Sequence, residues 1–155
     1  MKILIIGLGN PILGDDGVGW VIAQQVAQKC SGDPRVEVDC LSLGGLSLME
    51  RMVGYKRVIL IDSIHTGQHP VGSVNSFPLS DLPDLSAGHT TAAHDTSLRT
   101  ALNVGRSMDI MLPEDEDVQV VAIEAENVYD FSDELSQPVA AAVPHAVETV
   151  MKLLA

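Results

Sequence analysis

Three side chains that lie far apart in the sequence, Asp16, Asp62 and His94, belong to the residue types that bind transition-metal ions. Asp16 follows an apolar run and a glycine-rich loop, Asp62 ends a second apolar run, and His94 follows a polar segment. Two carboxylates and one imidazole leave coordination positions open for water or a substrate. These ligand types admit zinc, nickel, iron or manganese, so they indicate a metal site without naming the metal.

The segments that carry these residues are typical of an α/β protein. Apolar runs predict five strands, and helical spacing of apolar residues predicts three helices. The strands are expected over residues 2–6, 36–38, 57–61, 72–77 and 118–123, and the helices over about 17–29, 95–108 and 138–154. This alternation predicts a three-layer α/β/α sandwich with a mostly parallel, twisted five-stranded sheet, in which residues 72–77 form a short edge strand. The length and the lack of a long linker predict one domain over residues 1–155.

The predicted topology brings the three candidate ligands together. In an open α/β sheet, ligands bind outside the carboxyl ends of the strands. Asp16 follows the loop after the first predicted strand, and Asp62 stands at the end of the third. His94 opens the helix that leaves the polar loop over residues 78–93. We therefore expect all three side chains at one rim of the sheet.

Each candidate also has a purely structural explanation. Asp15 or Asp16 could cap the helix that starts near Gly17, because acidic groups are favoured in a first helical turn. Asp62 could cap a turn after its strand, and His94 could simply open a helix. These alternatives remain open at the level of the sequence.

Other ionisable residues are weaker candidates for the same rim. His89 is kept as a second histidine because it lies in the loop that leads to His94. The remaining histidines are expected to be solvated: His65, His69 and His145. Glu124 and Glu126, after the last predicted strand, could serve the rim or could be solvated strand-end residues.

The charge balance argues against several classes of protein. Nine basic residues stand against 21 acidic ones, which gives a formal net charge of −12. Such a chain is poorly suited to phosphate backbones or anionic membrane surfaces. No apolar run approaches the roughly 20 residues of a membrane span, and the N-terminus is typical of a buried strand rather than a signal peptide. With Cys30 and Cys40 expected as free thiols, we predict a cytoplasmic protein without a nucleic-acid or membrane partner.

The glycine-rich loop fits two familiar motifs poorly. A dinucleotide-binding loop that starts with Gly7-Leu8-Gly9 would need a third glycine where Ile12 stands, and Asp15-Asp16 would repel a pyrophosphate. The stretch 7–11 also resembles the start of bacterial peptidyl-tRNA hydrolases. That resemblance ends after five residues, since Trp20 stands in the neighbourhood where that family places its histidine.

A longer resemblance covers nearly the whole chain. Residues 9–19, Gly-Asn-Pro-Ile-Leu-Gly-Asp-Asp-Gly-Val-Gly, resemble the N-terminal signature of the hydrogenase maturation proteases. These enzymes trim the C-terminal extension from the large-subunit precursor of a nickel-iron hydrogenase. The likeness continues at residues 58–62, 94–98, 121–126 and 147–150. It departs at residues 40–43, Cys-Leu-Ser-Leu, where the family commonly shows Asp-Gly-Gly-Thr, and this loop is expected to border the rim.

The resemblance implies a function and a role for each candidate ligand. It implies an endopeptidase, of the aspartyl or the metal-dependent type, whose partner is the large-subunit precursor. Asp16, Asp62 and His94 would be the catalytic and metal-binding residues, and they would contact nickel already installed in that precursor. Zinc or cadmium could occupy the same site in vitro.

Two other functions stay open at this stage. A metal-binding chaperone or docking protein without catalytic activity would bind the precursor and leave its mass unchanged. A metal-dependent hydrolase of a small substrate would instead retain its own metal after purification.

Overall fold

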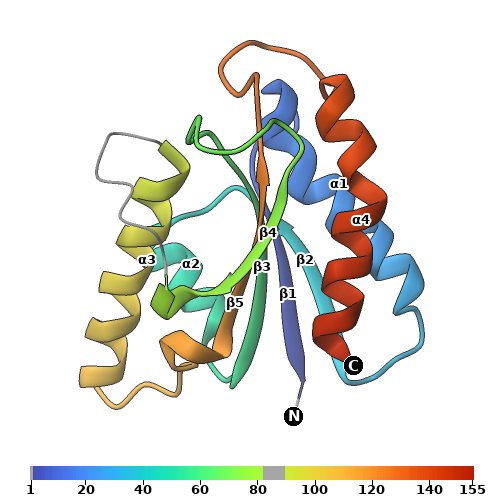
Figure 1. The fold of residues 1–155 in the computed structure, drawn as a ribbon. Helices are drawn as coiled ribbons and strands as arrows, with labels where there is room; N and C mark the ends of the chain where they lie inside the picture. Colours follow the sequence, from blue (N-terminus) through green and yellow to red (C-terminus); the bar gives the residue numbers. More distant parts are fainter. Residues whose placement is uncertain (1, 82–89) are drawn as a thin grey trace.

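The structure, a computed structural model, describes residues 2–81 and 90–155, and for residues 90–97 it describes the backbone alone. Five strands form one sheet in the order β2-β1-β3-β5-β4. Their bounds are β1 Ile3–Leu8, β2 Val36–Leu41, β3 Arg57–Ile64, β4 Val74–Pro78 and β5 Val118–Glu124. Neighbouring strands pair in parallel except β4, which runs antiparallel to β5 at the edge (Figure 1). The predicted fold class and the edge position of the fourth strand are therefore confirmed.

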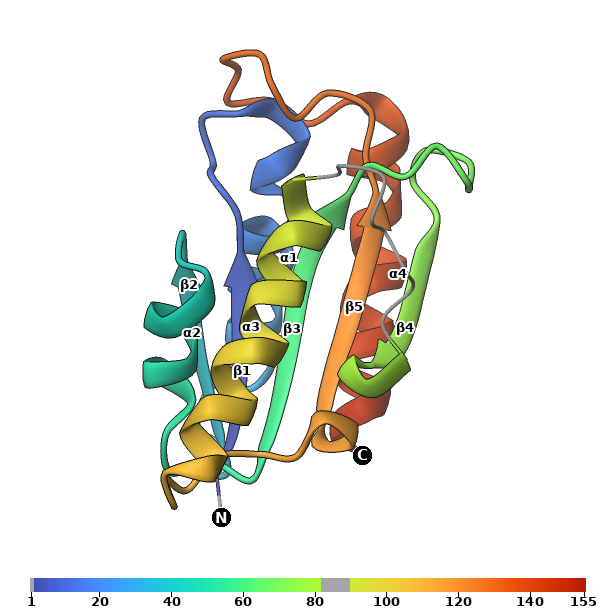
Figure 2. The ribbon, with the colours of Figure 1, turned by 90° about the vertical axis from the view of Figure 1, so that its left-hand side faces the viewer.

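Helices cover both faces of the sheet. The helices are α1 Val18–Lys29, α2 Gly45–Met52, α3 Thr90–Ser107 and α4 Gln137–Leu154. Helices α1 and α4 lie on one face, and α2 and α3 lie on the other (Figures 1 and 2). Alternate residues of a strand therefore enter different cores: Leu4 and Ile6 pack under α2 and α3, whereas Ile5 packs under α1 and α4. Burial on both faces explains the almost continuous apolar character of β1.

The chain reverses its direction across the sheet after β2. It moves outward from β1 through α1 to β2, and then returns through α2 to β3 on the other side of β1. The carboxyl ends of β1 and β3 therefore flank the topological switch point, where α/β proteins bind ligands. Because crossovers between parallel strands are right-handed, the returning connection must lie on the opposite face from α1.

The helix in that connection is a correction to the sequence prediction, which placed no element between β2 and β3. Leu48, Met49 and Met52 of α2 are buried, and their spacing is helical. The predicted start of α3 near Asp95 is also corrected, because the helix begins at Thr90. The third strand continues beyond Asp62 to Ile64.

Glycines let α1 approach the sheet at the switch point. A Cβ atom on Gly19 would lie 2.4 Å from the carbonyl oxygen of Leu8 and 2.5 Å from that of Ile61. Any side chain there would push α1 away from β1 and β3. The glycine therefore allows the segment before α1, which carries Asp16, to lie over the ends of both strands.

Candidate active site

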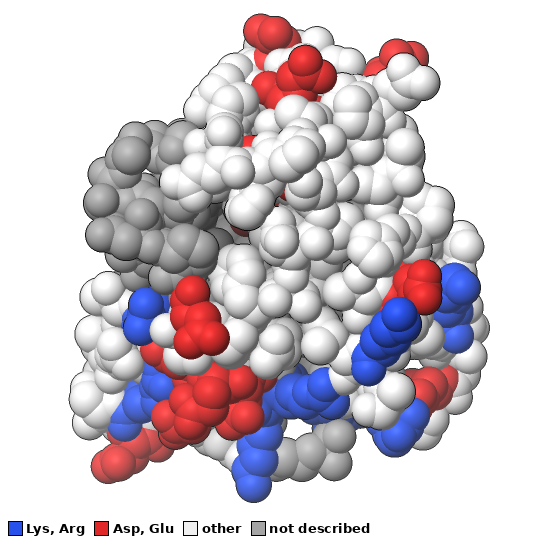
Figure 3. Space-filling view, viewed as in Figure 1, with Lys and Arg blue, Asp and Glu red and all other residues white. Residues whose placement is uncertain are grey.

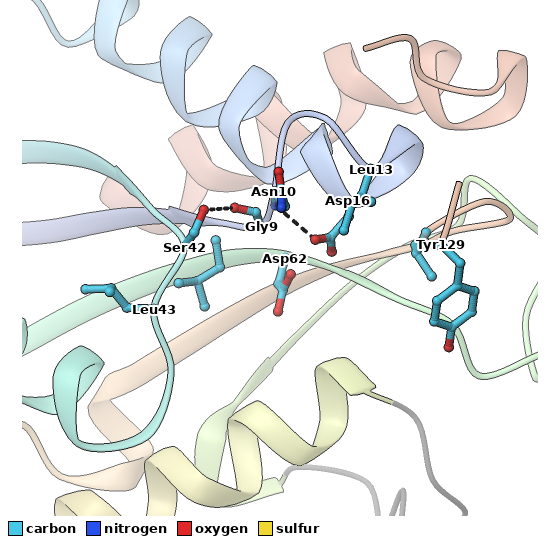
Figure 4. Close-up of a pocket in the computed structure, with 10 residues that line it drawn as sticks. Gly9, Asn10, Leu13, Asp16, Ser42, Leu43, Asp62 and Tyr129 are labelled. Carbon is cyan, nitrogen blue, oxygen red and sulfur yellow. Dashed lines mark hydrogen bonds between the residues drawn. The ribbon is translucent and has the colours of Figure 1, made fainter. Parts of the chain in front are cut away.

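Asp16 is held above the end of β3 by two hydrogen bonds. It belongs to a 3₁₀ turn over Gly14–Gly17 that follows the loop after β1. Its Oδ2 accepts a hydrogen bond of 2.9 Å from the backbone N–H of Asn10, and its Oδ1 accepts one of 3.0 Å from the Ser63 hydroxyl. The first of these bonds is drawn in Figure 4. The half-buried carboxylate is thus fixed in place and still borders solvent.

Asp62 lies on β3 with its side chain 3% exposed. Its Oδ1 accepts a hydrogen bond of 2.8 Å from the backbone N–H of Ser63. Leu60 and Ile64, two residues away on either side, pack in the core under α2 and α3. Because side chains alternate along a strand, Asp62 is directed to the face that α3 covers, and Ser63 is directed to the other face.

Both carboxylates line one cavity of about 360 Å³ (Figure 4). The wall comes from the carboxyl end of β1, the segments after β1, β2 and β5, and Asp62 of β3. The lining residues are Leu8, Gly9, Asn10, Leu13, Asp16, Ser42, Leu43, Asp62, Val128 and Tyr129. Most of this wall is apolar, and the two aspartates are its charged members. The predicted meeting of Asp16 and Asp62 at one rim is therefore observed.

Asp15 has a structural role that differs from the predicted helix cap. Neither the 3₁₀ turn nor α1 receives a capping hydrogen bond from a side chain, so the capping explanation is wrong for both aspartates. The Asp15 carboxylate is fully buried. It accepts backbone hydrogen bonds from Glu126, Asn127 and Ser136 at 2.7–3.0 Å, and one of 2.9 Å from the Ser136 hydroxyl. Burial by itself would raise its pKa, but these hydrogen bonds outweigh burial and hold the pKa below its ordinary value.

Glu124 is also occupied by a structural task. It is buried, and its carboxylate accepts hydrogen bonds from the backbone and hydroxyl of Thr66 and from the backbone of Gly67. This arrangement fastens the loop after β3 to the end of β5. Glu126 is exposed, and neither glutamate lines the cavity. The possibility that they serve the site directly is therefore not supported by the geometry.

The third predicted ligand, His94, lies in the N-terminal part of α3. This helix covers the face of the sheet toward which Asp62 is directed (Figure 2). The position of the His94 side chain lies outside the described part of the structure, as does the whole of His89. Among the described side chains, no three His, Cys, Asp or Glu residues form a group able to hold a metal ion. The assignment of His94 stays a prediction.

The remaining histidines divide into two groups. His69 and His145 are exposed, as predicted. His65 is half-buried, and its ring centroid lies 6.2 Å from that of Tyr129. His65 is therefore only partly solvated, since Tyr129 of the loop after β5 lies beside its ring.

Comparison with known proteins identifies the family. The sequence profile described as hydrogenase maturation protease matches residues 22–153. The chain belongs to the hydrogenase maturation protease family. It is 27% identical over 152 residues to a putative hydrogenase maturation protease of Methanocaldococcus jannaschii, with 96% of this chain and 94% of that protein covered. It is 23% identical over 153 residues to the hydrogenase expression/formation protein HupD of Rhizobium leguminosarum, with 99% of this chain and 74% of HupD covered.

Solved structures agree with this membership. The [NiFe] hydrogenase maturation protease HybD from Thermococcus kodakarensis superposes with a TM-score of 0.73 at 27% identity, with 99% of each chain covered. The hydrogenase maturating endopeptidase HybD from E. coli gives a TM-score of 0.78 at 22% identity, with 99% of this chain and 92% of that chain covered, and it shows the shared fold. Membership in this peptidase family makes the protein an endopeptidase. Within residues 2–81 and 90–155, no helix combines the length and the apolar character that crossing a bilayer requires.

Several residues of this maturation protease site were not predicted from the sequence. Ser63 donates to Asp16, and Val128 and Tyr129 form part of the cavity wall. The position of Ser63 directly after Asp62 was the available signal, since a strand-end hydroxyl next to a candidate ligand can reach the adjacent loop. The unusual segment after β2 does border the cavity, as expected. Its Ser42 hydroxyl donates to the carbonyl oxygen of Gly9 at 2.5 Å (Figure 4).

Proposed function

We propose that this endopeptidase removes the C-terminal extension of a nickel-iron hydrogenase large-subunit precursor after nickel has been inserted. Asp16, Asp62 and His94 would bind the nickel that the precursor carries. The observation that supports this proposal best is the meeting of Asp16 and Asp62 in one cavity at the switch point, in a chain of this family. The free cysteines Cys30 and Cys40 are consistent with a reducing cytoplasm as the place of the reaction.

The two carboxylates have the chemistry that the proposed metal contact needs. Each oxygen of an ionised carboxylate carries two lone pairs. Asp16 uses one hydrogen bond at each oxygen, so further acceptor capacity remains on the side that faces the cavity. Oxygen and imidazole ligands suit divalent nickel, and zinc or cadmium would accept the same ligands in vitro.

Nickel borne by the substrate would make recognition depend on metal loading. This protein would complete a coordination sphere that the precursor begins, so a precursor without nickel would lack that contact and would remain uncut. A metal ion in this position can polarise a peptide carbonyl or lower the pKa of a water molecule. One of the two carboxylates would then accept the proton of the attacking water, and the apolar cavity wall would limit access of bulk solvent.

Substitution of each proposed ligand tests the site. Asp16→Asn, Asp62→Asn and His94→Ala are each expected to abolish processing of the nickel-loaded precursor, with the far-ultraviolet circular dichroism spectrum unchanged. Glu116→Gln is the matched control, since Glu116 is exposed next to the amino end of β5, far from the cavity. Normal processing by all three ligand variants would contradict the assignment of the site.

A further inference from the structure

Large apolar side chains are exposed around the mouth of the cavity. Tyr129 and Phe131, in the segment after β5, are 64% and 83% exposed. Across the cavity, Leu43 is exposed in the segment after β2, Leu46 is exposed in the first turn of α2, and Ile12 is exposed in the loop after β1. These five residues are called the docking surface below. Exposed apolar groups gathered beside an active site are typical of a surface that binds a partner.

The backbone that carries Ile12, Tyr129 and Phe131 of this docking surface is firmly held. The N–H of Ser132 donates to the carbonyl oxygen of Ile12 at 2.9 Å, and the N–H of Gly14 donates to that of Ser132 at 2.8 Å. The buried Asp15 carboxylate ties the same two segments together through its hydrogen bonds to residues 126, 127 and 136. A partner would therefore meet a preformed surface, which lowers the entropy lost on binding.

Basic residues are confined to the opposite end of the molecule. Lys2, Arg35, Lys56 and Arg57 stand before or at the start of parallel strands, at the end remote from the cavity. Each of the four α-helices has one basic residue in its last turn, at that same end: Lys29, Arg51, Arg106 and Lys152. The remaining cation, Arg99, forms an ion pair with Asp115, just before β5. On the face in Figure 3, Lys and Arg atoms are seen only in the lower half.

The segment beside the docking surface is acidic. The stretch from residue 125 to 136 holds Glu126, Asp130, Asp133 and Glu134, all exposed, and no Lys or Arg. Within the described part of the chain, no ion pair involves these four carboxylates. Their field is therefore not cancelled by local cations, and it would attract a cationic partner toward the cavity.

We infer that the docking surface binds a segment of the precursor that carries both apolar side chains and Lys or Arg. This inference rests on the proposed function, because it assigns the substrate chemistry of the same site. A bond placed at Asp16 and Asp62 would bring the flanking chain against this surface, because Leu43 and Tyr129 line the same cavity as the two carboxylates. Apolar contacts there would contribute most of the affinity. The acidic segment would orient the precursor and raise its association rate.

Processing kinetics at two salt concentrations test this inference. The docking variants are Phe131→Ser and the double variant Asp130→Asn/Asp133→Asn. The control is Glu116→Gln/Asp117→Asn, which removes two exposed carboxylates at the remote end. With the nickel-loaded precursor, we expect Phe131→Ser to raise KM about ten-fold at either salt concentration. The double variant is expected to lower kcat/KM about five-fold in 50 mM salt and much less in about 300 mM salt, because salt screens exposed charges.

The outcomes separate this inference from the proposed function. If wild-type protein cuts the precursor and the docking variants stay within two-fold of it, the docking surface is wrong and the function stands. If wild-type protein does not cut the precursor, the proposed function fails. Binding of the same precursor, measured by interferometry, then decides the docking surface. A matching rise in Kd for the docking variants supports it, and equal Kd values, or no binding at all, overturn it.

Discussion

The hydroxyl of Ser63 donates a hydrogen bond of 3.0 Å to Oδ1 of Asp16 and thereby ties the loop after β1 to the end of β3. Ser63 is fully buried, and its own backbone N–H donates to Asp62. One residue thus contacts both carboxylates of the cavity. We regard Ser63 as a positioning residue that sets the separation and orientation of the two proposed ligands.

The first prediction concerns this contact. Ser63→Ala is expected to lower kcat/KM for the nickel-loaded precursor about ten-fold, because Asp16 loses a donor and gains rotational freedom. The free energy of unfolding should fall by only about 1 kcal/mol, since Asp16 borders solvent and can bond to water. Kinetics and urea unfolding measure the two effects. A loss of stability with unchanged processing would show that the contact is only structural.

Asp15 should control the acid stability of the protein. Its folded-state pKa lies below the ordinary value of 3.8, so its ionised form stabilises the fold above that pH. This contribution is lost as the pH falls through the folded-state pKa. Asp15→Asn should therefore reduce the free energy of unfolding by about 2–3 kcal/mol at pH 7, because an amide cannot accept all four hydrogen bonds. Urea unfolding between pH 7 and pH 3 should show the difference from wild type shrinking below about pH 4. A difference that is constant with pH would contradict this account.

Gly9 is predicted to be essential for the shape of the site. Its φ angle is +139°, and an added Cβ atom would lie 1.9 Å from the backbone oxygen of Asp16. Gly9→Ala should cost about 3 kcal/mol or more of stability and should abolish processing. Gly32→Ala is the matched control, since Gly32 also has a positive φ, of +86°, but has nothing within 4 Å of the added atom. That control should cost about 1 kcal/mol and leave processing intact. Equal effects of both variants would refute the steric explanation.

Cadmium provides a test of the ligand set that is independent of proteolysis. Calorimetric titration of the purified protein should show one site per chain, weakened at least about ten-fold by Asp16→Asn, by Asp62→Asn and by His94→Ala. Cys30 and Cys40 are competing soft ligands, although burial raises the pKa of both thiols. The titration should therefore be repeated with Cys30→Ser/Cys40→Ser. Cadmium binding that disappears in this variant and persists in the three ligand variants would place the ion elsewhere.

The strands and the meeting of the two carboxylates could be predicted because they follow from local signals. Continuous apolar runs identify strands buried on both faces, and parallel strands deliver their carboxyl ends to one rim. Asp16 and Asp62 stand at two such ends. The helix between β2 and β3 could also have been predicted, because two parallel strands of one sheet must be joined by a crossover connection, which is usually helical.

The roles of Asp15 and Glu124 could not be predicted, because their partners are distant in the sequence. Asp15 bonds to residues 126, 127 and 136, and Glu124 bonds to residues 66 and 67. The spacing of hydrophobic residues along the sequence predicts strands and helices but carries no information about such contacts. A carboxylate that anchors a loop and one that lines a cavity look alike in sequence, and only the geometry separates Asp15 from Asp16.

The most direct test of the proposed function is the intact mass of a hydrogenase large-subunit precursor from the same source, before and after mixing with this protein. The precursor is prepared both with and without nickel. We expect the loss of one C-terminal peptide from the nickel-loaded precursor and no change in the nickel-free form. An unchanged mass of the loaded precursor would contradict the proposed reaction, and equal cleavage of both forms would contradict recognition through nickel.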